Sequence, residues 1–166
     1  LFAREGAAVV AADLSDQVHG VVEEITAAGG RAIAQVGDAG DEGDVERLVA
    51  ACVKEYGGVD VAYANAGIIE SMNNRLFELT VDDWQRLLRL NPISALLLVK
   101  PAGQRLVHQL SGRLVLTAPV AGPPPHAAPP ADSARPTGVR RLSRAARITP
   151  AASRAQRTAA RRVIRR

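Results

Sequence analysis

Three residues with ligand-binding side chains stand where short runs of Val, Ile and Ala come to an end. They are Asp13 in AAVVAADL (7–14), Asp38 in RAIAQVGD (31–38) and Asn65 in VDVAYANAG (59–67). Such apolar runs are typical of strands buried on both faces. In an open α/β sheet, ligands bind just beyond the carboxyl ends of the strands, where a carboxylate can accept hydrogen bonds from a ligand's hydroxyl groups. The placement therefore predicts a ligand-binding edge.

Helical patterns separate these runs and continue after them. Apolar residues recur at helical spacing from Val18 to Ile25 and from Val45 to Tyr56. Thr80, with Asp83 three residues later, resembles a capping box, and the helix it opens runs through Asn91. Two prolines, Pro92 and Pro101, should kink or break that helix. A fourth strand is expected at GRLVLTA (112–118). Strands that alternate with amphipathic helices predict an α/β fold with a parallel, doubly wound sheet.

The composition fits one globular unit. The chain has 166 residues, of which 47% are hydrophobic but only 3% aromatic, so a core of Val, Leu, Ile and Ala is expected. No apolar run approaches the roughly 20 residues of a membrane helix, and the opening LFAREGAAVV lacks the pattern of a secretory signal. A single cysteine, Cys52, excludes an internal disulfide and favours the reducing cytoplasm. Cys52 itself reads as a small hydrophobe on a helix, and no metal-ligand pattern is present.

The charge distribution divides the chain sharply. All 17 Asp and Glu residues precede residue 133 and outweigh ten Lys and Arg, a net charge of −7, whereas residues 133–166 hold eleven Arg and no acid. Three segments are predicted: a core over 1–122, a proline-rich segment with a basic helix over 123–148, and a disordered Arg-rich tail over 149–166. The tail could contact nucleic acid only non-specifically, since no recognised module accompanies the arginines.

Residues 1 to about 122 resemble the short-chain dehydrogenase/reductase family. The resemblance rests on YANAGI (63–68), with REGAAVVAADL and GDAGDEGDVERLV before it and DDWQRLLRLN after it. It implies a Rossmann-type fold that transfers hydride between NAD(H) or NADP(H) and an alcohol or ketone. It is also compatible with homo-oligomers.

The resemblance assigns roles to individual residues. It implies cofactor contacts for Asp13, Leu14, Asp38, Ala39, Asn65, Ala66 and Gly67. The Asp13 carboxylate would bind the adenosine ribose and repel a 2′-phosphate, which favours NAD over NADP. The matching Asp and its neighbour contact adenine in the family, and Asn91 would hold a water in the proton relay. Purely structural roles stay open: a solvated strand-end acid, a helix cap at Asp38, a tight strand exit at Asn65 and a surface polar position at Asn91.

The family's catalytic Ser, Tyr and Lys are absent from the matching positions. TAPVAG places Pro119 on the Ser, and DSARPTGV places Asp132 on the Tyr and Pro136 on the Lys. Ionised Asp132 cannot donate a proton as a tuned tyrosine does, and neither proline carries a hydroxyl or a charge. We therefore expect an inactive or impaired oxidoreductase. The alternative is a non-catalytic nucleotide-binding or interaction protein on the same scaffold.

The resemblance also predicts missing strands. The chain begins after the family's first strand with its glycine-rich phosphate turn, and it ends in Arg-rich sequence where the family has two further strands. A sheet without the first strand leaves central backbone groups unpaired. We expect either part of a longer chain or strands paired in another order. A shifted reading frame in GC-rich coding DNA would also account for the Arg-rich ending.

Overall fold

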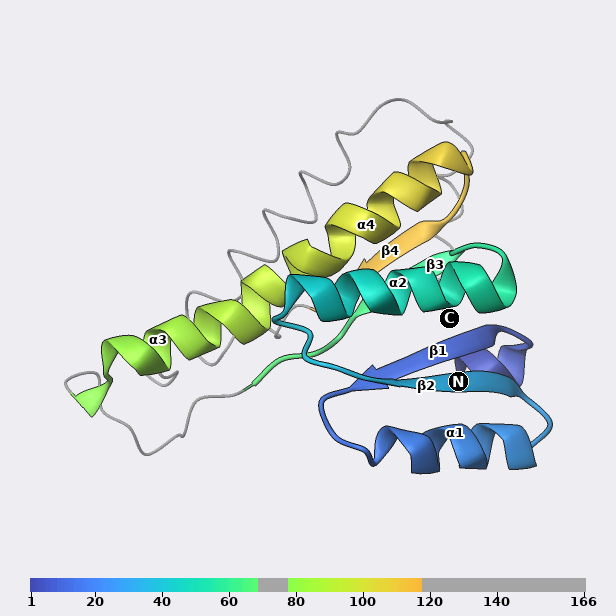
Figure 1. Ribbon diagram of the computed structural model, residues 1–166, viewed down its shortest axis with the longest axis horizontal. Helices are drawn as coiled ribbons and strands as arrows, with labels where there is room; N and C mark the ends of the chain where they lie inside the picture. The colour runs from blue at the N-terminus through green and yellow to red at the C-terminus, as the bar shows by residue number, and fades with distance from the viewer. Residues whose placement is uncertain (69–77, 118–166) are drawn as a thin grey trace, which may run out of the picture.

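The strands β1 (Ala8–Asp13) and β2 (Arg31–Val36) form a parallel pair in the computed structural model, which describes residues 1–68 and 78–117 (Figure 1). Their register runs from Ala8 opposite Arg31 to Asp13 opposite Val36. Helix α1 (Val18–Ala27) connects the two strands and packs against them. A short 3-10 helix, η1 (Phe2–Glu5), precedes β1 and ends at Gly6, whose φ of 87° is left-handed.

A second parallel pair is formed by β3 (Val61–Ala64) and β4 (Arg113–Leu116). The chain between them forms α3 (Val81–Leu88), a π-helical turn η3 (Arg89–Ile93) and α4 (Ser94–His108). Helix α4 packs against both strands of this pair. Helix α3 precedes it in the same helical stretch and lies further from the strands (Figure 1). The described residues therefore form an α/β structure with parallel strands, as the alternating pattern predicts.

Helix α2 (Glu42–Tyr56) lies between the two strand pairs (Figure 1). Asp41 caps the N-terminus of this helix, because its Oδ1 accepts a hydrogen bond of 2.9 Å from the Asp44 N–H. The helix packs against β1 on one side and against α4 on the other. Its apolar stripe enters a core that is built almost entirely of small aliphatic residues: Val49, Val59, Ala62 and Ala102, with Cys52, Val53, Leu98, Leu106 and Leu114 packed against them. The core thus has the aliphatic composition that the sequence predicts.

The four strands form two separate pairs within the described residues. The order is β1–β2 in one sheet and β3–β4 in the other, and no strand of residues 1–68 or 78–117 joins β1 to β3. β1 pairs along one edge with β2, and β3 pairs along one edge with β4. Among the described residues, the other edge of each of these two strands has no strand partner.

The helix after Thr80 begins as predicted, and its two prolines lie in different kinds of helix. Thr80 and Asp83 form a complete capping box, with the Asp83 N–H donating to Thr80 Oγ1 at 3.1 Å and the Thr80 N–H to Asp83 Oδ2 at 2.9 Å. Pro92 lies in the π-helical turn, where the expected interruption occurs. Pro101 lies inside α4, which continues through it, so the chain does not break there.

No helix in the described part of the chain is both long enough and apolar enough to span a bilayer.

Candidate functional site

The carboxyl ends of β1 and β2 lie side by side. Asp13 is opposite Val36 in the register, and the Gly37 N–H donates to the Asp13 carbonyl oxygen at 2.9 Å. The residues that follow each strand, Leu14 on one side and Asp38 on the other, therefore share one edge. The structure brings together the two cofactor-contact segments that the resemblance implicates here.

The Asp13 carboxylate is exposed and faces solvent at this edge. Its Oδ1 accepts a hydrogen bond of 2.9 Å from the Ser15 N–H, which orients the side chain through a local turn. Leu14 beside it is 70% exposed, so an apolar surface adjoins the carboxylate. A ligand could donate a hydroxyl hydrogen bond to the Asp13 carboxylate and pack an apolar ring against Leu14.

Asp38 is held more firmly than Asp13. Its Oδ1 accepts from the Gly40 N–H at 2.7 Å, and its Oδ2 accepts from Arg89 Nη2 at 2.8 Å. Its own N–H donates to Asp44 Oδ2 at 2.7 Å. The hydrogen bond from Gly40 and the Arg89 guanidinium hold the pKa of the Asp38 carboxyl below its usual value, against a smaller opposing effect of burial. Asp38 is ionised at neutral pH, and its neighbour Ala39 is half-buried.

The segment Asn65, Ala66 and Gly67 follows β3 and is exposed throughout. Asn65 is anchored by Thr117, the residue after β4, whose Oγ1 donates to Asn65 Oδ1 at 2.8 Å and lies 3.1 Å from the Tyr63 hydroxyl. The turn is thus fixed at its first residue while its small side chains stay accessible. Thr117 has no separate signal in the sequence, because it stands near the end of the predicted strand over 112–118.

Asn91 is a buried polar residue in the π-helical turn, with 5% of its surface exposed. Its Oδ1 accepts a hydrogen bond of 2.9 Å from the Ile68 N–H, directly after the Asn65–Gly67 segment. Its Nδ2 has no hydrogen-bond partner among the described residues. A buried donor of this kind is costly unless a water or ligand satisfies it, as the implied water-holding role requires.

The π-helical turn itself is locally stabilised. The Ser94 N–H bonds the Arg89 carbonyl oxygen, five residues back, and the Ser94 hydroxyl lies 2.8 Å from Leu90 O and 3.0 Å from Asn91 O. Single π-helical turns are frequent at functional sites, because they redirect a side chain that a regular helix would place elsewhere. Here the turn brings Arg89 towards Asp38 and Asn91 towards Ile68.

Arg89 is the site residue that sequence reasoning missed. It stands two residues before Asn91 in DDWQRLLRLN, and only its charge marks it in the sequence. The replaced positions Pro119, Asp132 and Pro136, together with all of residues 118–166, lie outside the described residues.

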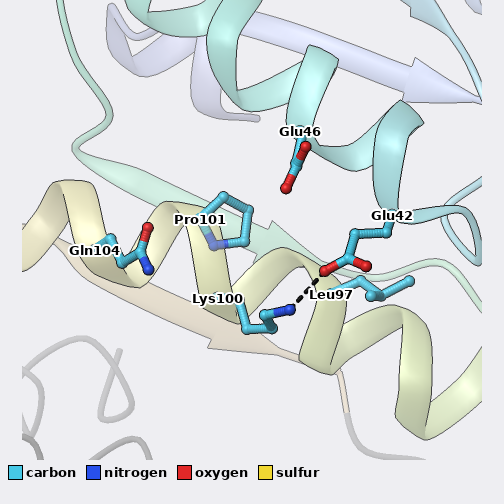
Figure 2. A pocket seen from close by; sticks show the side chains of 6 residues that line it. All are labelled: Glu42, Glu46, Leu97, Lys100, Pro101 and Gln104. Atoms are coloured by element: carbon cyan, nitrogen blue, oxygen red, sulfur yellow. Dashed lines mark hydrogen bonds and ion pairs between the residues drawn. The ribbon is translucent and has the colours of Figure 1, made fainter.

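A small pocket opens elsewhere, between α2 and α4 (Figure 2). It is lined by Glu42, Glu46, Leu97, Lys100, Pro101 and Gln104. Lys100 Nζ donates to Glu42 Oε1 at 2.5 Å, and this bond raises the pKa of the Lys100 ammonium group. The pocket shares no residue with the strand-end site. Over residues 1–68 and 78–117, no group of three His, Cys, Asp or Glu side chains could hold a metal ion.

Comparison with known proteins agrees with this geometry. The sequence profile of the short chain dehydrogenase family matches residues 1–154. The cis-4-hydroxycyclohexanecarboxylate dehydrogenase of Sinomonas cyclohexanicum is 35% identical over 92% of this chain and 61% of its own length. A crystal structure of a short chain dehydrogenase from Mycobacterium avium superposes with a TM-score of 0.75 at 26% identity, covering 85% of this chain and 55% of that one.

A second solved structure has the same fold. A metagenomic short-chain oxidoreductase in complex with NADP superposes with a TM-score of 0.79 at 24% identity, covering 87% of this chain and 65% of that chain. The present chain thus spans between about half and two thirds of the length of these proteins.

Proposed function

The chain belongs to the short-chain dehydrogenase family, and from that premise we propose that it is the nucleotide-binding part of an NAD(P)-dependent oxidoreductase of alcohols and ketones. The observation that carries the proposal is the convergence at the strand ends. Asp13 ends β1 and Asp38 follows β2 at the same edge, and Asp38 is linked through Arg89 to the turn whose Asn91 bonds the segment after β3.

The residues present fit a nicotinamide cofactor on its adenosine side. Exposed Asp13 would accept hydrogen bonds from the ribose hydroxyls, with Leu14 against the ring system. Asp38 and Ala39 would border the adenine. The exposed backbone of Asn65–Gly67 would pass close to the dinucleotide, and the unpaired Asn91 Nδ2 would be satisfied by a held water. When bound, the cofactor supplies the donor or acceptor of hydride.

We propose that NAD is preferred over NADP. The Asp13 carboxylate is accessible and would meet a 2′-phosphate with like charge at the ribose. The metagenomic oxidoreductase was solved in complex with NADP, so the proposed preference depends on the charge that Asp13 places at this edge.

We propose further that the fold is a doubly wound Rossmann-type sheet in which one more strand fits between β1 and β3. The separation of the described strands into two parallel pairs supports this. The three replaced positions support impaired catalysis: Pro119, Asp132 and Pro136 cannot supply the hydroxyl, the proton and the charge that the family's reaction needs. The same replacements favour the second candidate, a non-catalytic nucleotide-binding or interaction protein.

We also propose a substrate class, a cellular setting and partners for the chain. A small alcohol or ketone is the substrate class, and the name of the Sinomonas relative, which acts on a ring alcohol, supports it. The lone Cys52 supports a cytoplasmic setting. The family resemblance is compatible with a homo-oligomer. If the chain contacts nucleic acid, the Arg-rich tail makes the contact, and only non-specifically.

Calorimetric titration of the full chain with NADH and NADPH tests the proposed function. We expect weak binding, tighter for NADH, that adenosine monophosphate displaces competitively. Failure to bind either nucleotide, by a chain whose circular dichroism shows it folded, would refute the proposal.

A further inference from the structure

Arg89 connects two parts of the site that are far apart in sequence. Its Nη2 lies 2.8 Å from Asp38 Oδ2, on a residue 51 positions earlier. The side chains are 47% and 23% exposed, so the pair lies at the rim of the site and within reach of a ligand. Ion pairs so placed gain little stability, and a role in geometry is the better explanation of the contact.

The guanidinium also lies along the backbone of Gly40. A Cβ built on Gly40 would come within 2.7 Å of Arg89 Nη1 and 3.1 Å of its Cγ and Cζ, so a side chain at position 40 would require the arginine to shift. The same glycine donates its N–H to Asp38 Oδ1 at 2.7 Å. Each carboxylate oxygen of Asp38 therefore has its own donor, and these two bonds fix the plane of the carboxylate.

Arg89 opens the π-helical turn that also carries Asn91. One residue of that turn holds the segment after β2, and another holds Ile68 after β3 through a 2.9 Å hydrogen bond. The turn thus connects the carboxyl ends of two strand pairs that no described strand joins. Without the Arg89 contact, Asp38 would keep its hydrogen bonds with Gly40 and Asp44, but its Oδ2 would lose the donor that the structure gives it.

We propose that Arg89 is a positioning residue that holds the turn Asp38–Gly40 in the shape that receives the adenine of the cofactor. The inference rests on the proposed function and adds a residue to it. Arg89 acts through Asp38 and Gly40. Its effect is confined to the adenine half of the nucleotide, because its described contacts with the site all lie on that side.

Substitution of Arg89 tests the proposal with split ligands on the full chain. We expect Arg89→Gln to weaken the binding of adenosine monophosphate by about tenfold, the typical effect of one charge-assisted hydrogen bond, and to leave nicotinamide mononucleotide unchanged. Arg89→Lys keeps the charge and should recover part of the loss. The matched control is Arg86→Gln, which removes an exposed arginine from the last turn of α3.

Gly40→Ala should disturb the contact between Arg89 and Asp38 by a second, independent means. The added methyl group should displace the guanidinium without changing the charge of any residue, so it should reproduce the Arg89→Gln loss for adenosine monophosphate. The double variant should lose no more than either single variant, because both act on one contact.

A ligand-free measurement accompanies the titrations. The charged groups that face Asp38 are Arg89 from the π-helical turn and Asp44 from the first turn of α2. Carboxyl nuclear magnetic resonance should show the pKa of Asp38 higher in Arg89→Gln than in the unmodified chain, and unchanged in Arg86→Gln. A purely structural role elsewhere in the fold would leave this pKa unchanged.

The outcomes separate cleanly. Unchanged binding of adenosine monophosphate by Arg89→Gln, or equal weakening of both half-ligands together with a lower melting temperature, would overturn the proposal. If the unmodified chain binds neither half-ligand nor dinucleotide, the proposed function fails and the adenine-side role fails with it. The Asp38 titration would in that case still show whether Arg89 holds the carboxylate.

Discussion

The side-chain oxygen of Asn91 accepts a hydrogen bond from the backbone N–H of Ile68 at 2.9 Å, and so joins a π-helical turn to the segment that leaves β3. Asn91 is one of two buried polar residues among those described, and its Nδ2 is not satisfied by any described residue. The segment that borders the predicted cofactor is therefore held at both ends, by Thr117 at Asn65 and by the buried Asn91 amide at Ile68.

Asn91→Leu should destabilise the protein by about 1–3 kcal/mol, because the Ile68 N–H would be left without its partner. Urea unfolding followed by circular dichroism measures the change. Ser94→Ala removes the hydroxyl of the other buried polar residue among those described and serves as the comparison. A loss in Asn91→Leu no larger than in Ser94→Ala would show that the Ile68 bond contributes little.

Asp13→Asn should narrow the preference for NADH over NADPH, because the change removes the negative charge that would face a 2′-phosphate. The ratio of the two dissociation constants, from calorimetry, is the measurement. Asp16→Asn removes an exposed charge from the same loop and should leave the ratio unaltered. An equal shift in both variants would mean that general electrostatics, and not the position of Asp13, decides the ratio.

Gly112→Ala should be strongly destabilising, by at least about 2 kcal/mol. Gly112 has a φ of 123°, and an added Cβ would lie 2.1 Å from Leu106 Cδ2 and 2.8 Å from the Asp60 carbonyl oxygen. Gly20→Ala is the matched control, since Gly20 lies in α1 with nothing within 4 Å of an added Cβ. That substitution should stabilise by about 0.5–1 kcal/mol. Thermal melting that ranks the two variants in the opposite order would contradict the assigned packing at the start of β4.

The stability contributed by Asp38 should depend on pH in the acid range. Its pKa is lowered in the folded protein by the Gly40 hydrogen bond and by Arg89, so the contribution is present above the unfolded value of 3.8 and is lost as pH falls through the folded value. Because the pair is partly exposed, we expect about 0.5–1 kcal/mol. Urea unfolding of the unmodified chain and of Asp38→Asn, from about pH 7 to pH 2.5, should show their difference shrink towards acid. A difference that stays constant over this range would exclude the ionised carboxylate as its source.

The unmodified chain should show no appreciable oxidation of NADH with ketones or reduction of NAD with alcohols. Asp132 lacks the phenolic hydroxyl of the family's tyrosine, and Pro119 and Pro136 bring neither a hydroxyl nor a charge. Absorbance of the reduced nicotinamide over a panel of substrates measures turnover. Robust turnover would show that the three positions are not the catalytic ones.

Much of the fold follows from local patterns. The runs ending at Asp13 and Asp38 and the capping box at Thr80 were predictable, because burial and helix capping leave a periodic or short-range signature in the sequence. The contact of Arg89 with Asp38 was not, since it joins residues 51 positions apart and depends on a π-helical turn with no simple sequence signal. The continuity of α4 through Pro101 likewise depends on packing against β3 and α2, which outweighs the local preference of proline.

The separation of the strands into two pairs has a consequence for how the molecule opens. Backbone hydrogen bonds couple β1 to β2 and β3 to β4, but between the pairs the described contacts are made by side chains, chiefly through α2 and Arg89. Such a structure has two cooperative units joined by a weaker seam. Amide hydrogen exchange should therefore fall into two classes: the amides of β1, β2 and α1 should share one free energy of opening, and those of β3, β4 and α4 another.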